Sequence, residues 1–437
     1  APKTTSLMFA VTIRDHIMIA HSLPSEAFGP AQNLHGATYV VDAAFKSKKL
    51  DENNIVMDIG IAMDVLKEAL RPLQYQNLDD LPQFKGKLTT TEFLAKYIHQ
   101  EISKKVKANF KGKLKADNLW AKKGFVVFEE QFKIPFKVDK KTTKEKSQST
   151  LIVDETDKTI NIKNKKIMVS VDKKSGYITN FTSKGKKIIE SPLKLNFWRP
   201  ETENDAAYRR AKKQTNERDW MNAGDNFIVK KTIFNQPKKG KVAITISGEI
   251  KNPKTAVTLK YTILGNGKIT VNYSVNIDES APNIPKIGMQ FDISNQYKNV
   301  TYLGKGPQAN YQDRNSGALF GLYKADVNSM NYEYAVPQEY GNRMKTTWFQ
   351  LENSSKKGIH ISGIQPLNFS VLKYSTKNIE NAKHTNDLMI KNVFTVHIDL
   401  RQMGVGGDNT WSAKAEPHQQ YLLRPKKYNY SFSITPF

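Results

Sequence analysis

Residues 242–275 read VAITISGEIKNPKTAVTLKYTILGNGKITVNYSV, and their pattern sets the fold class of the larger part of the chain. Apolar side chains alternate with polar or small ones in three runs, which are centred on Ile244, Leu259 and Val271. A period of two places one face of a strand in a core and the other face in solvent. The pair Asn266-Gly267 is typical of a tight hairpin turn, so the second and third runs are predicted to pair as antiparallel strands.

Similar short segments recur from Leu151 to Phe437, so this region is predicted to be all β. Two large stacked sheets, each burying one face, would satisfy the pattern. At 437 residues the chain should divide into at least two domains. The expected protein is therefore mainly β.

The formal net charge of +25 is concentrated outside the first hundred residues. Residues 1–110 hold 13 Lys and Arg against 12 Asp and Glu. Elsewhere, lysine pairs such as Lys140-Lys141 and Lys238-Lys239 stand beside turn residues, which is typical of solvated hairpin tips. Since no RNA- or DNA-binding motif accompanies them, no specific nucleic-acid partner is expected. Attraction to acidic polysaccharide or weak nonspecific nucleic-acid binding is left open.

The chain has no cysteine, which excludes disulfides, thiolate nucleophiles and cysteine-ligated zinc. No stretch reaches the ~20 apolar residues that span a bilayer, and the N-terminal residues lack the pattern of a secretory signal. We therefore expect a soluble protein without a membrane partner. The cytoplasm is the favoured compartment, and the periplasm is left open.

The first hundred residues combine strands with helices. Residues 8–21 and 38–45 have the β-branched and aromatic content of paired strands. Residues 61–70 have helical apolar spacing, and this helix should end near Pro72. A second helix is expected to begin with a capping box, in which Thr89 accepts a backbone hydrogen bond and Glu92 reaches back.

Five segments of this region resemble the family of 6-pyruvoyl-tetrahydropterin and 6-carboxytetrahydropterin synthases, over about residues 8–108. The segments are IMIAHSL at 17–23, LHGATY at 34–39, IVMD at 55–58, PLQYQNLD at 72–79 and TTE at 90–92. The resemblance implies a small α+β tetrahydropterin-synthase-like domain, the T-fold, over residues 1–112. It also implies a catalytic zinc held by three histidines, with one position open for substrate.

His21 and His35 match the first two zinc ligands that the resemblance implies, and Ala37 stands at the third. His16 would replace the missing ligand only if its strand bulges, because residues 16 and 21 otherwise point to opposite faces. His16, His21 and His35 are therefore the candidate metal-binding residues, and zinc is the candidate cofactor.

The proton-transfer residues implied by the same resemblance are absent. The family uses a cysteine base and an Asp-His pair, whereas this chain has no cysteine and carries Gln74 and Tyr75 where the pair is expected. After Phe110 we recognise no match to the family's terminal hairpin, which carries a pterin-anchoring glutamate. An altered zinc enzyme and a degenerate pterin-binding module are both left open.

Residues 113–150 are interpreted as a junction. Trp120 to Pro135 resembles the last strand of the immunoglobulin-like domain that precedes the C-terminal domain of β-galactosidases, and Lys137 to Thr150 reads as a polar linker. Because both resemblances break at about 108–120, a natural fusion and a composite sequence are both left open.

Four further motifs occur in the order found in the C-terminal domain of family 2 β-galactosidases. They are FWRPETEND at 197–205, YLGKGPQANYQDR at 302–314, PQEYGNR at 337–343 and QMGVGGDNTW at 402–411. Residues 118–437 thus resemble the β-galactosidase small chain, which in some bacteria is a separate subunit that completes the active site of a large chain. The resemblance implies a galactose-mutarotase-like β supersandwich over 151–437, a galactoside sugar as ligand, and a large chain or a second copy as partner.

The 402–411 motif carries the candidate sugar site. Its glycines permit close backbone approach and positive φ, and Trp411 offers a flat apolar face to sugar C–H groups. Trp411, Asp408 and Asn409 are the predicted sugar-binding residues, and the alternative is that Trp411 packs in the core. Structural roles are expected for the other polar motif residues, which are Asn204, Asp205, Asp313, Glu339 and Arg343.

No catalytic residue is predicted. Retaining glycoside hydrolysis needs two carboxylates about 5 Å apart, and in the resembled family both lie in a barrel domain of about 250 residues. No such strand-helix alternation exists here, so the chain alone should not hydrolyse lactose. A non-catalytic carbohydrate-binding or assembly protein is the remaining alternative.

Overall fold

The computed structural model describes residues 9–47, 55–105, 107–133, 149–213 and 216–437. The chain divides into two compact units, Ala1–Thr143 and Lys144–Phe437. This division falls inside the predicted junction at 113–150. No helix in the described ranges is long and apolar enough to cross a membrane.

The first unit has the predicted order of two long strands followed by two helices. β1 (Phe9–His21) pairs antiparallel with β2 (His35–Ser47) along its whole length, and β3 (Gln76–Asn77) adds a short parallel partner to β1. α1 (Ile59–Leu70) and α2 (Thr91–Lys105) supply buried side chains such as Leu66 and Leu94 to the same core as Ile17 of β1. The α+β character predicted for this region is confirmed.

The start of α2 differs from the predicted capping box. The hydroxyl of Thr90 accepts the hydrogen bond from the backbone N–H of Phe93, at 3.3 Å, so Thr90 is the capping residue. The hydroxyl of Thr89 lies instead 2.8 Å from a ring nitrogen of His21. A run of three threonines offers no sequence signal for which of them faces the helix.

A two-stranded hairpin closes the first unit. β4 (Lys107–Lys113) pairs antiparallel with β5 (Val126–Lys133), although no terminal hairpin is recognisable in the sequence. The pairing is hard to read because twelve residues separate the strands and no tight-turn dipeptide marks the connection. β5 lies within the segment that resembles an immunoglobulin-like strand.

The second unit is built from two sheets. One has five strands in the order β10-β9-β8-β7-β6, and the other has twelve, along the path β11-β16-β21-β20-β22-β15-β14-β13-β12 with β17, β18 and β19 branching from β20. The bounds of the smaller sheet are β6 (Ile152–Glu155), β7 (Thr159–Lys163), β8 (Ile167–Asp172), β9 (Ile178–Ser183) and β10 (Lys186–Lys187). Those of the larger sheet are β11 (Lys194–Asn196), β12 (Ile228–Lys238), β13 (Lys241–Ile250), β14 (Thr255–Leu264), β15 (Ile269–Ile277), β16 (Lys286–Ser294), β17 (Asn299–Gly306), β18 (Leu319–Asp326), β19 (Arg343–Glu352), β20 (Gly358–Leu372), β21 (Val393–Gln402) and β22 (Lys427–Pro436).

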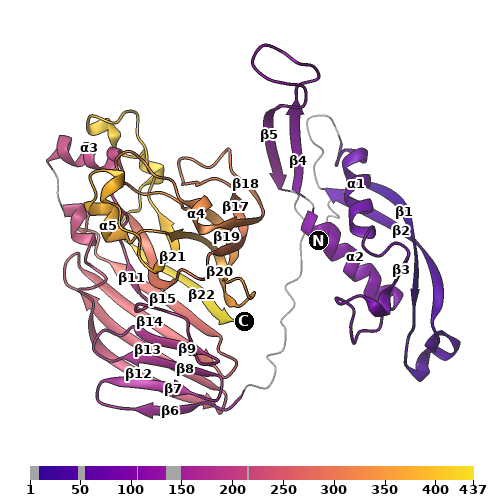
Figure 1. The fold of residues 1–437 in the computed structure, drawn as a ribbon, viewed down its shortest axis with the longest axis horizontal. Helices are drawn as coiled ribbons and strands as arrows, with labels where there is room; N and C mark the ends of the chain where they lie inside the picture. The colour runs from indigo at the N-terminus through magenta and orange to yellow at the C-terminus, as the bar shows by residue number, and fades with distance from the viewer. Residues whose placement is uncertain (1–8, 48–54, 106, 134–148, 214–215) are drawn as a thin grey trace, which may run out of the picture. The chain divides into compact units, whose positions relative to one another are not determined.

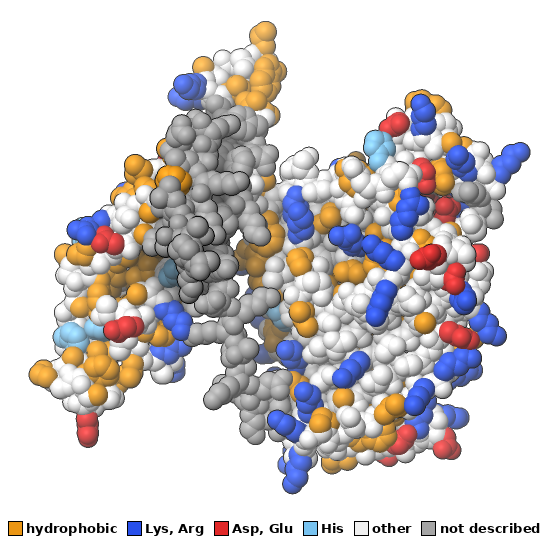
Figure 2. Space-filling view, turned by 180° about the vertical axis from the view of Figure 1, so that it is seen from behind, with side chains coloured by type: hydrophobic (Ala, Val, Ile, Leu, Met, Phe, Trp, Pro, Cys, Tyr) orange, Lys and Arg blue, Asp and Glu red, His pale blue; other side chains and the backbone are white. Residues whose placement is uncertain are grey.

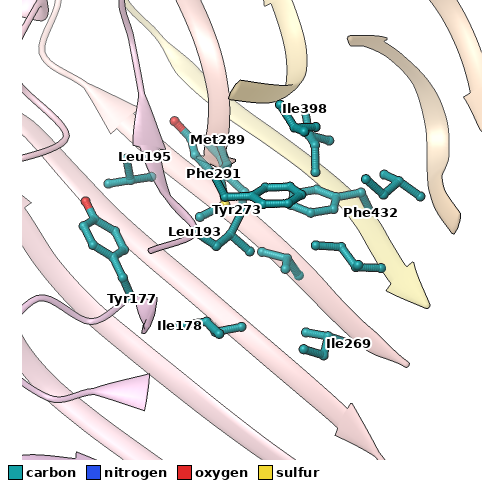
Figure 3. Close-up of a cluster of buried hydrophobic side chains, with 14 of the residues drawn as sticks. Tyr177, Ile178, Leu193, Leu195, Ile269, Tyr273, Met289, Phe291, Ile398 and Phe432 are labelled. Carbon is teal, nitrogen blue, oxygen red and sulfur yellow. The ribbon is translucent and has the colours of Figure 1, made fainter. Parts of the chain in front are cut away.

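The two sheets share one hydrophobic core, which makes the unit a β sandwich (Figure 1). Ile178 comes from the smaller sheet, whereas Tyr273, Phe291 and Phe432 come from the larger one, and all four are buried in the same cluster (Figure 3). The predicted tight turn also forms, because Leu264 N–H donates to Lys268 O at 2.9 Å and Gly267 has φ of 92°. The mainly β prediction is confirmed.

Among the described residues of the second unit, three short α-helices interrupt the strands: α3 (Glu203–Lys212), α4 (Val327–Met330) and α5 (Thr376–Asn381). α3 begins with a capping box between Thr202 and Asp205, so Asp205 has the structural role expected for it. This helix stands beside the loop that carries Trp411.

Candidate functional site

The loop after β21 presents Trp411 to solvent. Its side chain is 79% exposed, so the alternative in which Trp411 packs in the core is wrong. The loop leaves the sheet at Gln402, which is buried, and ends in the single 3-10 turn Ala413–Ala415. A large exposed aromatic side chain at the end of a loop is available for contact with a ligand.

The buried Arg199 and the partly buried Asp313 hold the first half of this loop. Arg199 donates to Met403 O at 2.8 Å and to Gly404 O at 2.6 Å, while its guanidinium also pairs with Asp205 at 3.1 Å. Asp313 accepts from the backbone N–H groups of Val405 and Gly406 at 2.7 and 2.9 Å. The loop is therefore fixed by polar contacts at both its carbonyl and its amide groups.

The second half of the loop is fixed by asparagines. Asn204 of α3 donates to Asn409 O at 2.9 Å and to Ala415 O at 3.2 Å, joining both ends of the segment around Trp411. The side-chain oxygen of Asn409 accepts from Trp411 N at 3.2 Å and from Ser412 N at 3.1 Å. In the structure Asn409 thus orients the backbone of Trp411, and its contact with sugar stays a prediction.

Two glycines of the loop allow neighbouring atoms to lie close to the loop backbone. A Cβ on Gly404 would lie 2.7 Å from a carboxylate oxygen of Asp313, and one on Gly407 would lie 2.3 Å from Lys414 O. None of the glycines at 404, 406 and 407 has a positive φ, so the expected use of the left-handed region is wrong here. At 404 and 407 the neighbouring atoms leave no room for a side chain, so space requires glycine at these two positions.

Asp408, which precedes Trp411 by three residues, is hydrogen-bonded to His418. Its carboxylate lies 2.6 Å from Nε2 of His418, and both side chains are more than half exposed. The hydrogen bond from His418 lowers the pKa of Asp408, so the carboxylate is ionised at neutral pH. An exposed carboxylate can accept hydrogen bonds from sugar hydroxyls.

We expect Asp313→Ala to loosen the loop without unfolding the sandwich, because Val405 and Gly406 would lose their only side-chain acceptor in the described structure. Hydrogen exchange at these two amides should speed up by about tenfold or more, as expected for the loss of charge-assisted hydrogen bonds. Exchange at Val271 of β15 is the internal control. Unchanged exchange at 405 and 406 would contradict the anchoring role of Asp313.

In the first unit, His21 and His35 stand opposite each other at the end of the β1–β2 pair. Their ring centroids are 4.7 Å apart, and His21 is 2% exposed. Burial and the neighbouring His35 lower the pKa of His21, which favours the neutral imidazole that metals require. Nδ1 of His35 lies 2.9 Å from Asn33 O, and Nδ1 of His21 lies 2.8 Å from the hydroxyl of Thr89, so each Nδ1 already has a partner.

His16 does not join this pair. The β1–β2 register runs without a shift, and His16 opposes Val40, with 61% of its side chain exposed beside Asp15. The bulge that His16 would need as a ligand is therefore absent, because a regular strand sends residues 16 and 21 to opposite faces. Ala37 opposes Ile19. Across the described residues, no group of three or more His, Asp or Glu side chains is placed to hold a metal ion.

A buried ionic cluster that sequence reasoning missed lies near the end of β21. Lys286 is fully buried, with Nζ donating to Nδ1 of His397 at 2.9 Å and lying 3.4 Å from Asp399 and 3.8 Å from Glu339. Burial raises the pKa of Asp399 to about 7, although Lys286 opposes that shift. Burial and Lys286 lower the pKa of His397 well below its usual value. Gln402, which begins the Trp411 loop, donates to Glu339 at 3.4 Å.

On the visible face of the second unit, the basic side chains are spread out (Figure 2). On the face seen in Figure 2, Lys and Arg side chains are scattered among uncharged ones and interspersed with acidic ones. This face has no continuous basic stripe of the kind that tracks a nucleic-acid backbone.

Comparisons with known proteins find a different similarity for each of the two units. The family sequence model described as beta galactosidase small chain matches residues 163–434, and the one described as 6-pyruvoyl tetrahydropterin synthase matches residues 10–122. Among curated proteins, the β-galactosidase of Priestia megaterium is 30% identical over 325 residues, covering 74% of this chain. That of Pseudoalteromonas haloplanktis is also 30% identical and covers 73%.

The chain spans 31% of the length of each of these two relatives. Both matches reach further toward the N-terminus than residue 163, because their share of the chain exceeds the range 163–434 and only three residues follow Ile434. Among solved structures, 6-pyruvoyl tetrahydropterin synthase of Caenorhabditis elegans covers 22% of this chain and 79% of its own, with 24% identity and a TM-score of 0.21. Galactose 1-epimerase of Lactobacillus acidophilus covers 67% of this chain and 99% of its own, with 10% identity and a TM-score of 0.37.

Proposed function

Because this chain belongs to the β-galactosidase small-chain family, we propose that its larger unit presents Trp411 to a galactoside at an active site that another polypeptide completes. The observation that carries the proposal is the state of Trp411, which is 79% exposed at the end of an anchored loop. An exposed indole whose backbone is held by Asn409 is preorganised for stacking on a sugar ring.

In this proposal the second unit binds and orients the sugar and does not itself catalyse its hydrolysis. The face of the Trp411 ring would cover the apolar C–H face of the sugar, and Asp408 would accept a hydrogen bond from a hydroxyl. The anchors Arg199, Asn204 and Asp313 hold the loop so that little conformational entropy is lost when the sugar binds. The acid and the nucleophile of hydrolysis would come from the partner, either a large chain or a second polypeptide of the same kind.

The proposal predicts that the chain alone does not hydrolyse a chromogenic galactoside. Mixing it with the large chain of a two-subunit β-galactosidase should restore hydrolysis, because only then do the sugar platform and the two carboxylates meet. Initial rates for each chain and for the mixture are the measurement, with the large chain plus an unrelated basic protein as control. Turnover by the chain alone would sink the idea.

For the first unit we propose a zinc site with only two histidine ligands, His21 and His35. The specific observation is the contact of the two rings at 4.7 Å, with each Nδ1 held by another group. When bound, zinc would supply a Lewis acid at this position. The residues present do not fit the three-histidine site of the resembled synthases, since Ala37 occupies the third position and His16 points away. Pterin chemistry therefore has neither its full ligand set nor its base here.

We expect two imidazoles to hold zinc only weakly. Elemental analysis after dialysis should find well below one zinc per chain, and titration should show binding that is lost in His21→Ala and retained in His16→Ala. The His16 variant is the matched control, because it removes an exposed histidine from the same strand. One tightly held zinc per chain would contradict the two-ligand site.

A further inference from the structure

An open groove of about 290 Å³ lies on the solvent face of the larger sheet. It spans β12, β13 and β14, which lie side by side at one end of the strand order of that sheet (Figure 1). Its volume is close to the lower end of the ~300–1,000 Å³ range of small-molecule sites. The groove is therefore large enough to hold part of an organic ligand.

The alternation of the strands decides which side chains line the groove. On β13 the even-numbered residues from Val242 to Ile246 are fully buried in the core of the sandwich. Because successive side chains of a strand point to opposite faces, Lys241, Ala243 and Thr245 point away from that core. The same residues line the groove, so its lining is the outer face of the sheet.

Ala243 accounts for the hollow shape of this face. It stands opposite Asn235 of β12 and opposite Thr262 of β14, and Lys241 and Thr245 flank it along β13. All four neighbours have longer side chains and line the groove as well. The methyl group of Ala243 therefore forms a floor that longer polar side chains surround.

The groove combines cationic and neutral polar groups without an acidic one. Lys241 and Lys260 line it, and none of its described lining residues is aspartate or glutamate. Within the described part of the chain, neither lysine is ion-paired with a carboxylate. The hydroxyls of Thr245 and Thr262 and the amide of Asn235 add neutral hydrogen-bonding groups. This set of groups favours a ligand that has both negative charges and hydroxyls.

The two lysines stand toward opposite ends of the groove. Lys260 of β14 is the partner of Thr245, which lies four residues along β13 from Lys241. At about 3.3 Å per residue, their backbones are separated by roughly 13 Å along the strands. An elongated ligand with more than one anionic group matches this spacing better than a single small anion.

An acidic saccharide chain has this combination of groups. Its carboxylates pair with the ammonium groups, its hydroxyls bond to the threonines and the asparagine, and its C–H groups contact Ala243 and Ile233, which is 49% exposed. A neutral sugar would leave both lysines without a partner. A single-stranded nucleic acid fits less well, because none of the described lining residues is an aromatic side chain on which a base could stack.

We propose that the groove across β12, β13 and β14 binds an acidic oligosaccharide, with Lys241 and Lys260 toward its two ends and Ala243 as its floor. The proposal goes beyond the galactoside site and does not depend on it. In the order of the sheet β13 is five strands from β21, which leads into the Trp411 loop, or about 24 Å along the sheet at the usual strand spacing. The groove gives a specific place to the attraction to acidic polysaccharide that the net charge of +25 leaves open.

The test is a calorimetric titration of the full chain with oligogalacturonate, a chain of uronic acids, at low ionic strength. The methyl ester of the same oligosaccharide keeps the rings but not the charges, and it should bind about tenfold more weakly. Lys241→Ala combined with Lys260→Ala should weaken binding of the acid by about tenfold, as expected for the loss of two exposed charge pairs. Trp411→Ala should leave this binding unchanged, which separates the groove from the galactoside site.

A second variant tests the shape of the groove without changing its charge. Ala243→Ile fills the floor with a side chain that suits a strand, and it should weaken binding of oligogalacturonate by about as much as the lysine variant. Near-ultraviolet circular dichroism should show that both variants fold like the parent, because the substituted side chains face solvent.

Lys254→Ala combined with Lys298→Ala is the matched control, because it removes the same charge from exposed lysines outside the groove. Equal weakening in this control would show that the overall charge binds the polysaccharide, and it would overturn the proposal. The proposal also fails if the parent does not bind oligogalacturonate or if the groove variants bind it like the parent. Tighter binding of polyuridylate that the groove variants abolish would make the groove a nucleic-acid site instead.

Discussion

Lys286→Met is expected to destabilise the second unit by about 3–5 kcal/mol at neutral pH, the range for removing one partner of a buried ion pair. Lys286 is the only lysine or arginine that the described structure pairs with Asp399 and Glu339, and all three side chains are at most 1% exposed. The methionine fills the space but leaves two carboxyl groups and His397 in an apolar interior. Urea unfolding followed by near-ultraviolet circular dichroism is the measurement.

The loss should depend on pH. Asp399 already has a pKa of about 7, raised chiefly by burial. A carboxyl whose pKa is raised in the folded state contributes stability below its unfolded value, near 4, and loses it as the pH rises through the folded value. Without Lys286 the carboxyl groups can remain buried only as neutral acids, so the variant should lose less stability at pH 5 than at pH 8.

Lys298→Met is the matched control, because Lys298 pairs with Asp326 at the surface and is 56% exposed. Its effect should stay within about 0.5 kcal/mol, as for most exposed pairs. Adding Glu339→Gln and Asp399→Asn to Lys286→Met should restore much of the lost stability, since no buried charge is then left uncompensated. A Lys286→Met variant as stable as the parent at both pH values would show that Lys286 does not compensate the charge of these buried carboxyl groups.

The strands of the sandwich were predictable because burial of one sheet face imposes a period of two on the sequence. Val242, Ile244 and Ile246 are all fully buried on β13, and Asn266-Gly267 forms the predicted turn. The burial of Lys286 could not be predicted from this alternating pattern. Only the lysine pairs beside turn residues are interpreted as solvated from the sequence, and nothing local marks Lys286 as buried. Its burial is set by β21, whose His397 and Asp399 come more than a hundred residues later.

The candidate site could also be predicted only in part. The motif at 402–411 indicated an exposed aromatic side chain, and Trp411 is exposed. The contacts that hold it join the side chains of Arg199, Asn204 and Asp313 to backbone atoms of the loop. Every residue has the same backbone groups, so the sequence does not show which residue accepts or donates these hydrogen bonds. The pairings can be identified only in the folded structure. The same holds for His16, whose exclusion depends on an unbroken β1–β2 register.

Trp411→Ala is expected to weaken galactoside binding about 10- to 100-fold in the completed enzyme. Stacking would remove most of an indole face that is now 79% exposed from water, which contributes about 1–3 kcal/mol through apolar burial and ring geometry. If the ring contacts substrate in both the ground state and the transition state, KM should rise more than kcat falls. Steady-state kinetics on the mixture with a large chain measure both quantities.

Two variants separate a sugar platform from a structural role for this side chain. Trp411→Phe keeps an aromatic face and should retain most of the affinity, whereas loss of a structural tryptophan would not be rescued in this way. Trp120→Ala removes a tryptophan that is 63% exposed in the other unit and should leave KM unchanged. Because Trp411 lies outside the buried core, urea unfolding of Trp411→Ala should match the parent. Equal KM values for Trp411→Ala and the parent would show that the sugar does not meet this ring, whatever holds the loop in place.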